Sequence, residues 1–325
     1  MPANLPPQYF EVERRYRQAR TSEERIQMLQ EMLAIMPKHK GTEKLQAELR
    51  TKISKLRKEE QRKRAQRRKV HGYHVEREGA AQVVLVGPPN SGKSQLVATL
   101  TNATPEIAAY PFTTRKPSVG MMDFEDIKIQ LVDTPPLTED SPEWWMVEIM
   151  RNADLLLGVF DLGEETLAAQ VKTIMDRLEQ SKITVSDAPK EEGYVEKKLL
   201  ILANKSDVEG AEVRFDRLKG NYQNRFQIVK TTLKDLSQAA GLKRLIFDAL
   251  CIVRVYTKAP GKPADMKDPL ILRRGDTVLD AGRSIHKDFG RELKYARVWG
   301  GDHLQGQRVE KTYALQDKDI VEFHI

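Results

Sequence analysis

The stretch QVVLVGPPNSGKS, from Gln82 to Ser94, decides the fold. Its apolar start, residues 82–86, has the character of a buried strand, and GPPNSGKS then fits the pattern G-x-x-x-x-G-K-S ahead of a helical pattern. The glycines let backbone N–H groups close around a polyphosphate, and the following helix presents its positive end to it. Lys93 is expected to reach the β- and γ-phosphates, and the Ser94 hydroxyl is expected to bind Mg²⁺. The sequence therefore predicts a phosphate-binding site made of Gly87, Pro88, Pro89, Asn90, Ser91, Gly92, Lys93, Ser94 and Gln95.

Similar short apolar runs follow this loop, with helical patterns between most of them. They cover residues 127–132, 155–160 and 199–202, and a polar excursion occupies 181–198. Strands that alternate with helices favour a mostly parallel sheet with right-handed crossovers. We therefore predict an α/β P-loop NTPase domain over residues 79–252.

The tetrapeptide NKSD, from Asn204 to Asp207, follows the last of these runs, as the guanine-reading sequence N-K-x-D does in Ras-like GTPases. A carboxylate accepts from guanine N1–H and from the exocyclic amine, whereas adenine has an acceptor at the first position and no amine at the second. Asp207 would therefore discriminate, Asn204 would hold the other edge of the base and brace the loops, and the Lys205 stem would cover the ring. Alone, NKSD also fits a helix cap or an Asx turn. Combined with the phosphate loop, it predicts a Ras-like G domain that binds GTP and GDP.

Three further segments have the spacing of nucleotide-responsive loops. DTPP begins at Asp133, where a carboxylate would hold Mg²⁺ through water, and YPFTT ends at Thr114, whose hydroxyl would bind Mg²⁺ only when a γ-phosphate is present. Thr113 is the alternative to Thr114. The last nucleotide loop, commonly S-A-K-like, is assigned to Thr231 and Thr232 within KTTL, which matches that pattern poorly.

Segments on either side of the G domain have different patterns. Residues 1–78 are helical in period, with a break at Pro37 and Gly41, and the helix over 57–69 is dense in Lys and Arg. That basic helix fits either a solvated helix end or a contact with RNA or a ribosome. The C-terminal domain is expected over residues 253–325, with a polar boundary stretch near 257–268. Its pattern predicts a small sheet packed on one helix, with the helix around 277–295 and strands at 309–314 and 320–325.

Several quoted motifs together resemble one family. YPFTT and KPSVG, placed between GPPNSGKS and DTPP, are similar to the Obg/DRG family of translation-factor-class GTPases. VRVYTK, GDTVLDAGRSIHKDF, KYARVWG and ALQDKDIVEFHI resemble the TGS domain, a β-grasp module that ends the DRG branch. The resemblance covers residues 82–325 and implies guanine-nucleotide binding, slow hydrolysis, and ribosome or RNA association. There is no room for the extra inserted subdomain that is common in DRG proteins.

The chain departs from the usual G-domain pattern beside the γ-phosphate position. Pro136 stands at the glycine of D-x-x-G and has no N–H to donate to a phosphate. Leu137 stands where Ras-like enzymes have a catalytic glutamine, and an apolar side chain cannot orient water, so intrinsic turnover should be slow. Asn90 occupies the place where relatives bind K⁺, and a choice for turn geometry is the alternative. The chemistry is thus expected to depend on Lys93, Thr114 and Asn90.

Composition limits the compartment and the partners. The 325 residues are 40% hydrophobic, carry a formal net charge of +7, and include one cysteine, Cys251. The charge favours an anionic partner, and a lone cysteine fits a reducing compartment. No basic start followed by an apolar run is present, and no run approaches the ~20 apolar residues of a membrane span. We expect a cytoplasmic protein without a membrane or DNA-specific role.

Two classes of function remain open from the sequence. In the first, the protein is a GTPase switch in which GTP and Mg²⁺ order Thr114 and the Asp133 loop. This ordering changes how the basic helix 57–69 and the TGS domain hold a ribosomal or RNA partner. Hydrolysis then resets the switch. In the second, Pro136 and Leu137 make hydrolysis negligible, and the protein is a guanine-nucleotide-dependent binding module or a sensor of a guanine alarmone.

Overall fold

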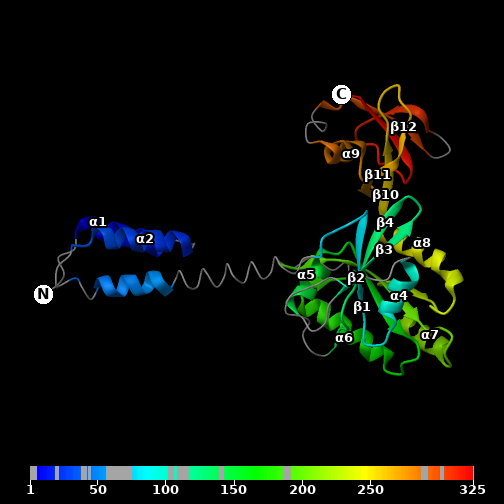
Figure 1. Ribbon diagram of the computed structural model, residues 1–325, viewed down its shortest axis with the longest axis horizontal. Helices are drawn as coiled ribbons and strands as arrows, with labels where there is room; N and C mark the ends of the chain where they lie inside the picture. The colour runs from blue at the N-terminus through cyan, green and yellow to red at the C-terminus, as the bar shows by residue number, and fades with distance from the viewer. Residues whose placement is uncertain are drawn as a thin grey trace. The chain divides into compact units, whose positions relative to one another are not determined.

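The computed structural model describes residues 6–18, 22–37, 42, 45–55, 75–101, 106–107, 117–138, 143–185, 192–286, 292–300 and 304–324. The chain divides into two compact units, Met1–His74 and Val75–Ile325 (Figure 1). Among the described residues, no helix is both long enough and apolar enough to cross a membrane.

The first unit is helical over its described residues. It contains α1 (Pro7–Gln18), α2 (Ser22–Ile35) and a helical stretch over 45–55. The apolar positions at three-to-four spacing meet in one core because they share a face of each helix. That core includes Val12, Ile26, Leu29, Met32, Met36, Leu49 and Ile53. The basic helix expected over 57–69 lies outside the described residues.

The larger sheet of the second unit confirms the predicted α/β class. Its seven described strands have the order β2-β3-β4-β1-β5-β8-β9, and every pair from β4 to β9 is parallel, whereas β2–β3 and β3–β4 are antiparallel. The bounds are β1 (Ala81–Val86), β2 (Glu106–Ile107), β3 (Ser118–Phe124), β4 (Ile127–Asp133), β5 (Leu155–Asp161), β8 (Lys198–Asn204) and β9 (Gln227–Lys230). The polar excursion over 181–198 contributes the two short strands β6 (Ile183–Thr184) and β7 (Val195–Glu196).

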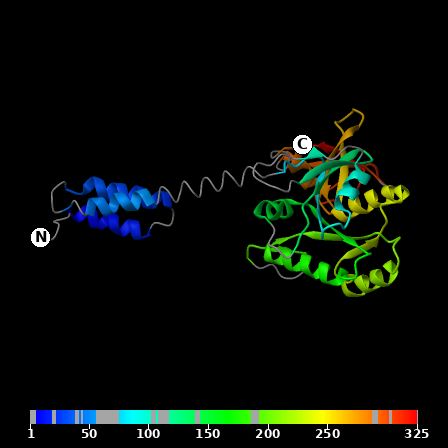
Figure 2. The same cartoon turned by 60° about the horizontal axis from the view of Figure 1, so that its bottom comes forward.

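Helices cover both faces of this sheet (Figures 1 and 2). Side chains of α4 (Lys93–Leu100) and α8 (Ala239–Leu250) pack on one face, against alternate strand residues such as Val83 and Leu131. Helices α6 (Leu167–Gln180) and α7 (Ala211–Tyr222) lie on the other, and α5 (Trp144–Asn152) follows β4. Strands covered on both faces are buried along their whole length, which is why β1 and β5 are apolar except at Gln82 and at the terminal Asp161.

The C-terminal part forms a smaller sheet on one helix. The strand order is β11-β10-β14-β12-β13, and α9 (Val278–Ile285) begins with a capping box between Thr277 and Asp280. The strands are β10 (Ile252–Thr257), β11 (Asp265–Arg273), β12 (Tyr295–Gly300), β13 (Leu304–Val309) and β14 (Asp319–His324). Their inward side chains form a core of their own, with Val255, Val278, Ala296, Val298 and Val321 at its centre.

Two expectations for this part were wrong. The helix expected to reach Tyr295 ends at Ile285, because His286 is already extended at φ −155°, and Tyr295 begins β12 instead. No strand covers 309–314: β13 ends at Val309, a turn follows in which the Tyr313 N–H donates to Glu310 (3.1 Å), and Ala314 forms only an isolated bridge.

Candidate functional site

The predicted phosphate loop leaves β1 and enters α4 through backbone positions that a side chain would obstruct. A Cβ added to Gly87 would lie 2.3 Å from the Val159 carbonyl oxygen, and one added to Gly92 would lie 2.4 Å from the Asn204 amide nitrogen. Gly92 has φ +99°, and Asn90 is left-handed at φ 58°, a conformation that Asn tolerates better than most residues. The loop is therefore held close to two neighbouring strands, with its N–H groups free of side-chain bulk.

Lys93 is buried in this loop. Its Nζ donates to the carbonyl oxygens of Gly87 (3.1 Å) and Pro88 (2.8 Å). Burial lowers the pKa of Lys93 to about 8, although the charge of Asp133 acts in the opposite direction. A desolvated ammonium that is held by loop carbonyls can exchange those weak acceptors for phosphate oxygens.

Asp133 ends β4 beside the first turn of α4. The Ser94 hydroxyl donates to its Oδ2 (2.5 Å), while its buried Oδ1 has no partner. Burial raises the pKa of Asp133, against the lowering effects of Ser94 and Lys93. A buried carboxylate oxygen without a donor, next to a serine hydroxyl, fits the oxygen ligands that Mg²⁺ requires.

The NKSD loop contacts the phosphate loop directly. The buried Asn204 side chain donates from Nδ2 to the Ser91 carbonyl (3.0 Å), and Lys205 donates from Nζ to the Asn90 carbonyl (3.1 Å). The amide oxygen Oδ1 of Asn204 is buried without a partner. Because parallel strands β1 and β8 end at the same edge of the sheet, these loops meet although they are far apart in sequence.

Asp207 is held by the loop that follows β9. Its two carboxylate oxygens accept from the Thr232 hydroxyl (2.8 Å) and from Lys234 Nζ (2.5 Å). Hydrogen bonds from Lys234 and Thr232 lower the pKa of Asp207, so its carboxylate is ionised near neutral pH. Thr231 is joined to the same region by its backbone, because its carbonyl accepts from the Ser206 N–H (3.0 Å).

Sequence reasoning missed Asp161, which ends β5 between the two loops. Its buried carboxylate accepts from Lys205 Nζ and from the Gly163 N–H (2.7 Å), so it fixes the lysine stem beside the loop. The signal was the same one that marks Asp133 and Asn204: a polar residue directly after an apolar strand. Lys234 was also missed, because one lysine in a polar loop carries no pattern.

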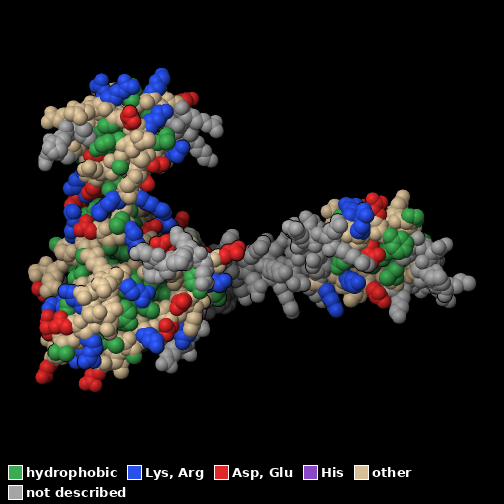
Figure 3. Space-filling model, turned by 180° about the vertical axis from the view of Figure 1, so that it is seen from behind, with side chains coloured by type: hydrophobic (Ala, Val, Ile, Leu, Met, Phe, Trp, Pro, Cys, Tyr) green, Lys and Arg blue, Asp and Glu red, His purple; other side chains and the backbone are tan. Residues whose placement is uncertain are grey.

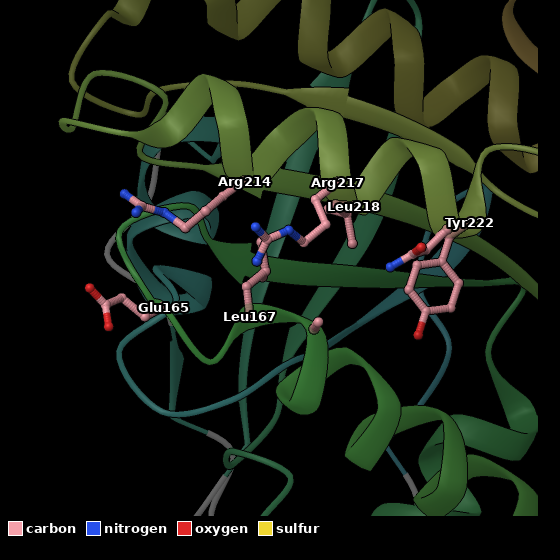
Figure 4. A pocket seen from close by; sticks show the side chains of 8 residues that line it. Glu165, Leu167, Arg214, Arg217, Leu218 and Tyr222 are labelled. Atoms are coloured by element: carbon pink, nitrogen blue, oxygen red, sulfur yellow. The ribbon is translucent and has the colours of Figure 1, made fainter.

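The phosphate loop, the segment that begins at Asp133 and the Lys205 side chain line a cavity of about 600 Å³, whereas Asn204, Asp161 and Asp207 are not among its lining residues. A second hollow, between α6 and α7, holds only about 20 Å³. Figure 4 shows that Arg214, Arg217 and Tyr222 of α7 line one side of it and that Glu165 and Leu167 line the other. Room for one water molecule excludes a nucleotide there. The large cavity is lined by Pro89, Asn90, Ser91, Gly92, Lys93, Ser94, Gln95, Asp133, Thr134, Pro135, Pro136 and Lys205. Thr113 and Thr114 lie outside the described residues.

The two departures from the G-domain pattern lie at the rim of this cavity and behind it. Pro136 lines the cavity, whereas the Leu137 side chain is buried. The Leu137 N–H donates to the Gly87 carbonyl (3.1 Å), and the Thr134 hydroxyl donates to Leu85 (2.7 Å). The segment after Asp133 is therefore fastened to the phosphate loop by its backbone.

Comparison with known proteins gives matches to both parts of the second unit. Residues 82–205 match the family described as 50S ribosome-binding GTPase, and residues 253–325 match the TGS domain. An uncharacterized GTP-binding protein of Methanocaldococcus jannaschii is 30% identical over 359 residues, which cover 92% of each chain. The human developmentally-regulated GTP-binding protein 2 is 26% identical over 92% of this chain and 98% of its own. A solved G domain of the T. maritima FeoB iron transporter aligns with 52% of this chain and 96% of its own at 21% identity, with a TM-score of 0.37.

Proposed function

We propose that this chain, which belongs to the Obg/DRG family of GTP-binding proteins with a C-terminal TGS domain, is a GTP-hydrolysing switch. Its partner would be a ribosome or an RNA. The observation that carries the proposal is the bond from Asn204 to Ser91, which joins the guanine-reading loop to the phosphate loop beside the large cavity. One ligand with a guanine and a polyphosphate would engage both loops.

Mg²⁺ would bind at Ser94 and Asp133, with Thr114 joining when a γ-phosphate is present. Held by these oxygens, Mg²⁺ would supply positive charge beside the β- and γ-phosphates. Lys93 moves from the carbonyls of Gly87 and Pro88 to the phosphates, where its ammonium stabilises their negative charge.

Hydrolysis is expected to be slow because neither Pro136 nor Leu137, on the segment after Asp133, can orient water. Pro136 has no N–H, and the Leu137 N–H is already donated to Gly87. The buried Leu137 side chain supports the same expectation. These two residues favour the alternative function, a nucleotide-dependent binding module with negligible turnover.

The β3–β4 hairpin supports a switch that reaches the C-terminal domain. Its ladder runs from the pair Ser118–Asp133 to the pair Phe124–Ile127, seven residues on each strand. At about 3.3 Å per residue it spans roughly 20 Å. The Mg²⁺-binding end of the ladder lies at Asp133, and the turn at its other end presents Glu125 and Asp126 to the C-terminal domain.

Arg254 of β10 binds the two carboxylates of this turn. Its fully buried guanidinium donates to Glu125 (2.8 Å) and Asp126 (2.5 Å), and to both carboxylate oxygens of Asp317 (3.0 and 2.7 Å). It also lies over the rings of Phe124 and Phe247, 5.7 and 4.9 Å from their centroids. Figure 3 shows charged side chains of both signs gathered where the two sheets meet. A movement of the hairpin would therefore act on Arg254 directly.

The first test is phosphate release from GTP in KCl and in NaCl, with and without ribosomes, with Lys93→Ala as the blank. We expect slow release in NaCl and an increase of about tenfold in KCl if Asn90 ligates K⁺. The variant Asn90→Gly keeps the left-handed backbone but lacks the amide. It should therefore lose the K⁺ response.

The outcomes separate the two functions. Retention of the K⁺ response by Asn90→Gly would assign Asn90 to turn geometry. Release equal to the blank in every condition, with GTP still bound, would reject the switch and support the binding module.

The basic helix expected over 57–69 gives a second prediction. Reversing charge at Arg62, Lys63, Arg67 and Arg68 should weaken ribosome co-sedimentation and flatten its salt dependence, because fewer counterions are released from phosphates. The matched control reverses Lys52 and Lys55, two exposed lysines on the preceding helical stretch. Co-sedimentation that is the same in both variants and in the wild type would remove this helix from the proposal.

A further inference from the structure

The outer face of the C-terminal sheet carries aromatic and basic side chains together. Strand β12 alternates strictly: Ala296 and Val298 are buried in the core, so Tyr295, Arg297 and Trp299 lie on the opposite face. Tyr295 pairs with His324 of β14, and Arg297 pairs with Arg308 of β13. We call Tyr295, Trp299, His324, Lys258, Arg297 and Arg308 the aromatic–basic face.

The rings of this face are stacked on one another or covered by a cation. Tyr295 stacks on His324 with ring centroids 4.4 Å apart and planes 11° from parallel. The Arg308 guanidinium lies 4.1 Å from the Tyr295 ring centroid, and Lys258 Nζ lies 4.4 Å from that of Trp299. Each ring thus already accepts a flat or charged group against its π face.

The Trp299 ring packs against Gly306, where the missing side chain leaves room for it. A Cβ on Gly306 would lie 2.7 Å from the ring, and Gly306 has φ +80°, which most side chains disfavour. The indole therefore lies flat over β13, with the other ring face under Lys258. A surface tryptophan with this support is a defined platform and not a loosely packed side chain.

We propose that the aromatic–basic face binds single-stranded RNA, with bases stacked on Trp299 and Tyr295 and with phosphates bound by Lys258, Arg297 and Arg308. Stacking on aromatic rings is open to any base, and three cations, one each from β12, β13 and the residue after β10, match the charge of a phosphate backbone. This inference rests on the proposed function and specifies how the C-terminal domain would meet its RNA partner.

Charge on this face favours RNA over an acidic or apolar protein surface. Its one buried carboxylate, Glu322, is already paired with Lys258 (3.2 Å) and with His324 (2.8 Å), so it presents little free negative charge. Arg297 and Arg308 are exposed. When a base replaces the cation above a ring, that cation can turn to the adjacent phosphate, so the same residues serve both states.

The test measures binding of a fluorescein-labelled oligouridylate, twelve nucleotides long, to the full-length chain by fluorescence anisotropy. We expect Trp299→Leu and Tyr295→Leu to raise Kd by about tenfold each. The variant Lys258→Gln/Arg308→Gln leaves the rings in place and should lower the slope of log K against log salt by about 1.4, that is 0.7 per lost phosphate contact. Trp144→Leu, the same change on an exposed tryptophan of α5, is the control and should bind as the wild type does.

Each of the other possible results of this experiment would contradict a specific part of the proposal. Wild-type RNA binding that survives all three variants overturns this face and leaves the proposed function standing. Ring variants that lose ribosome co-sedimentation but keep oligouridylate binding would make the partner a ribosomal protein and overturn the RNA assignment. No binding of RNA or ribosomes by the wild type rejects both the face and the proposed partner. An unchanged melting temperature and far-UV circular dichroism spectrum in each variant verify that the C-terminal sheet is folded.

Discussion

The Asp207→Asn variant is expected to bind GTP about a hundredfold more weakly than the wild type and to gain affinity for XTP. The Asp207 carboxylate is ionised and is oriented by Thr232 and Lys234. Guanine would use both of its oxygens as acceptors, and two charge-assisted hydrogen bonds are worth roughly 1.5–3 kcal/mol each. An asparagine offers one acceptor and one donor, which suits the second carbonyl of xanthine.

Competition between GTP and XTP for a fluorescent guanine nucleotide measures this change. Asp216→Asn is the matched control, because Asp216 is an exposed residue of α7 outside the loop. If Asp207→Asn left both GTP affinity and the preference for GTP over XTP unaltered, NKSD would not be the base-reading loop. Loss of both nucleotides, with a lower melting temperature, would show instead that Asp207 acts by holding the Thr232 loop.

The Arg254→Met variant should lower the free energy of unfolding by about 2–4 kcal/mol. The substitution keeps apolar volume between Phe124 and Phe247 but leaves three carboxylates facing one another. Because Glu125, Asp126 and Asp317 retain 25–40% side-chain exposure, water offsets part of the cost. Circular dichroism should show a melting temperature roughly 5–10 °C lower. Arg244→Met, at an exposed residue of α8, should change it little.

The pH dependence of stability gives a second measurement on the same cluster of charged side chains. Hydrogen bonds from Lys318 and Arg254 lower the pKa of Glu125 to about 2, from an ordinary value near 4.5. A carboxyl with a depressed folded pKa stabilises the protein above its unfolded pKa, and that contribution is lost as the pH falls from about 4.5 toward 2. In Arg254→Met this acid-dependent loss should be smaller, because the native state no longer favours the charged form as strongly.

The nucleotide response of Arg254→Met tests the hairpin as the connection to the C-terminal domain. In the wild type, the ratio of ribosome affinities with GTP and with GDP should differ from one, and in the variant it should approach one. A variant that is less stable but retains the wild-type ratio would restrict Arg254 to a structural role.

The parts of the site that depend on local backbone chemistry were predictable from the sequence. A strand, a glycine-rich loop and a helix form the phosphate site within fourteen residues, Ala81–Ser94, so the motif contains its own structural context. NKSD and Asp133 follow apolar strands, and parallel strands bring their carboxyl ends together. The seven-stranded order itself could not be deduced, because the partners of each strand are fixed by packing over the whole domain.

Other features depend on contacts that no short pattern reveals. Arg254 occurs in the run IVRVYT, where one arginine in a strand suggests a solvent-facing position, yet it is the largest buried charge at the junction. Two of its partners, Glu125 and Asp126, lie about 130 residues earlier in the turn after β3, and the third, Asp317, lies 63 residues later. Tyr295 was assigned to the end of a helix because Leu293 shares an apolar face with Ile285 and Phe289 at helical spacing, although the period from Tyr295 onward is two.

One peptide bond separates the two cores of the second unit. Ile252 packs with α8 and the larger sheet, and Val253 packs with the smaller one. An expression fragment that stopped or started there would divide β10, separate Arg254 from Glu125 and Asp126, and expose strand edges that favour aggregation. A break there therefore damages both parts of Val75–Ile325, so activity lost from a fragment that ends or begins at this bond cannot be assigned to the part that is missing.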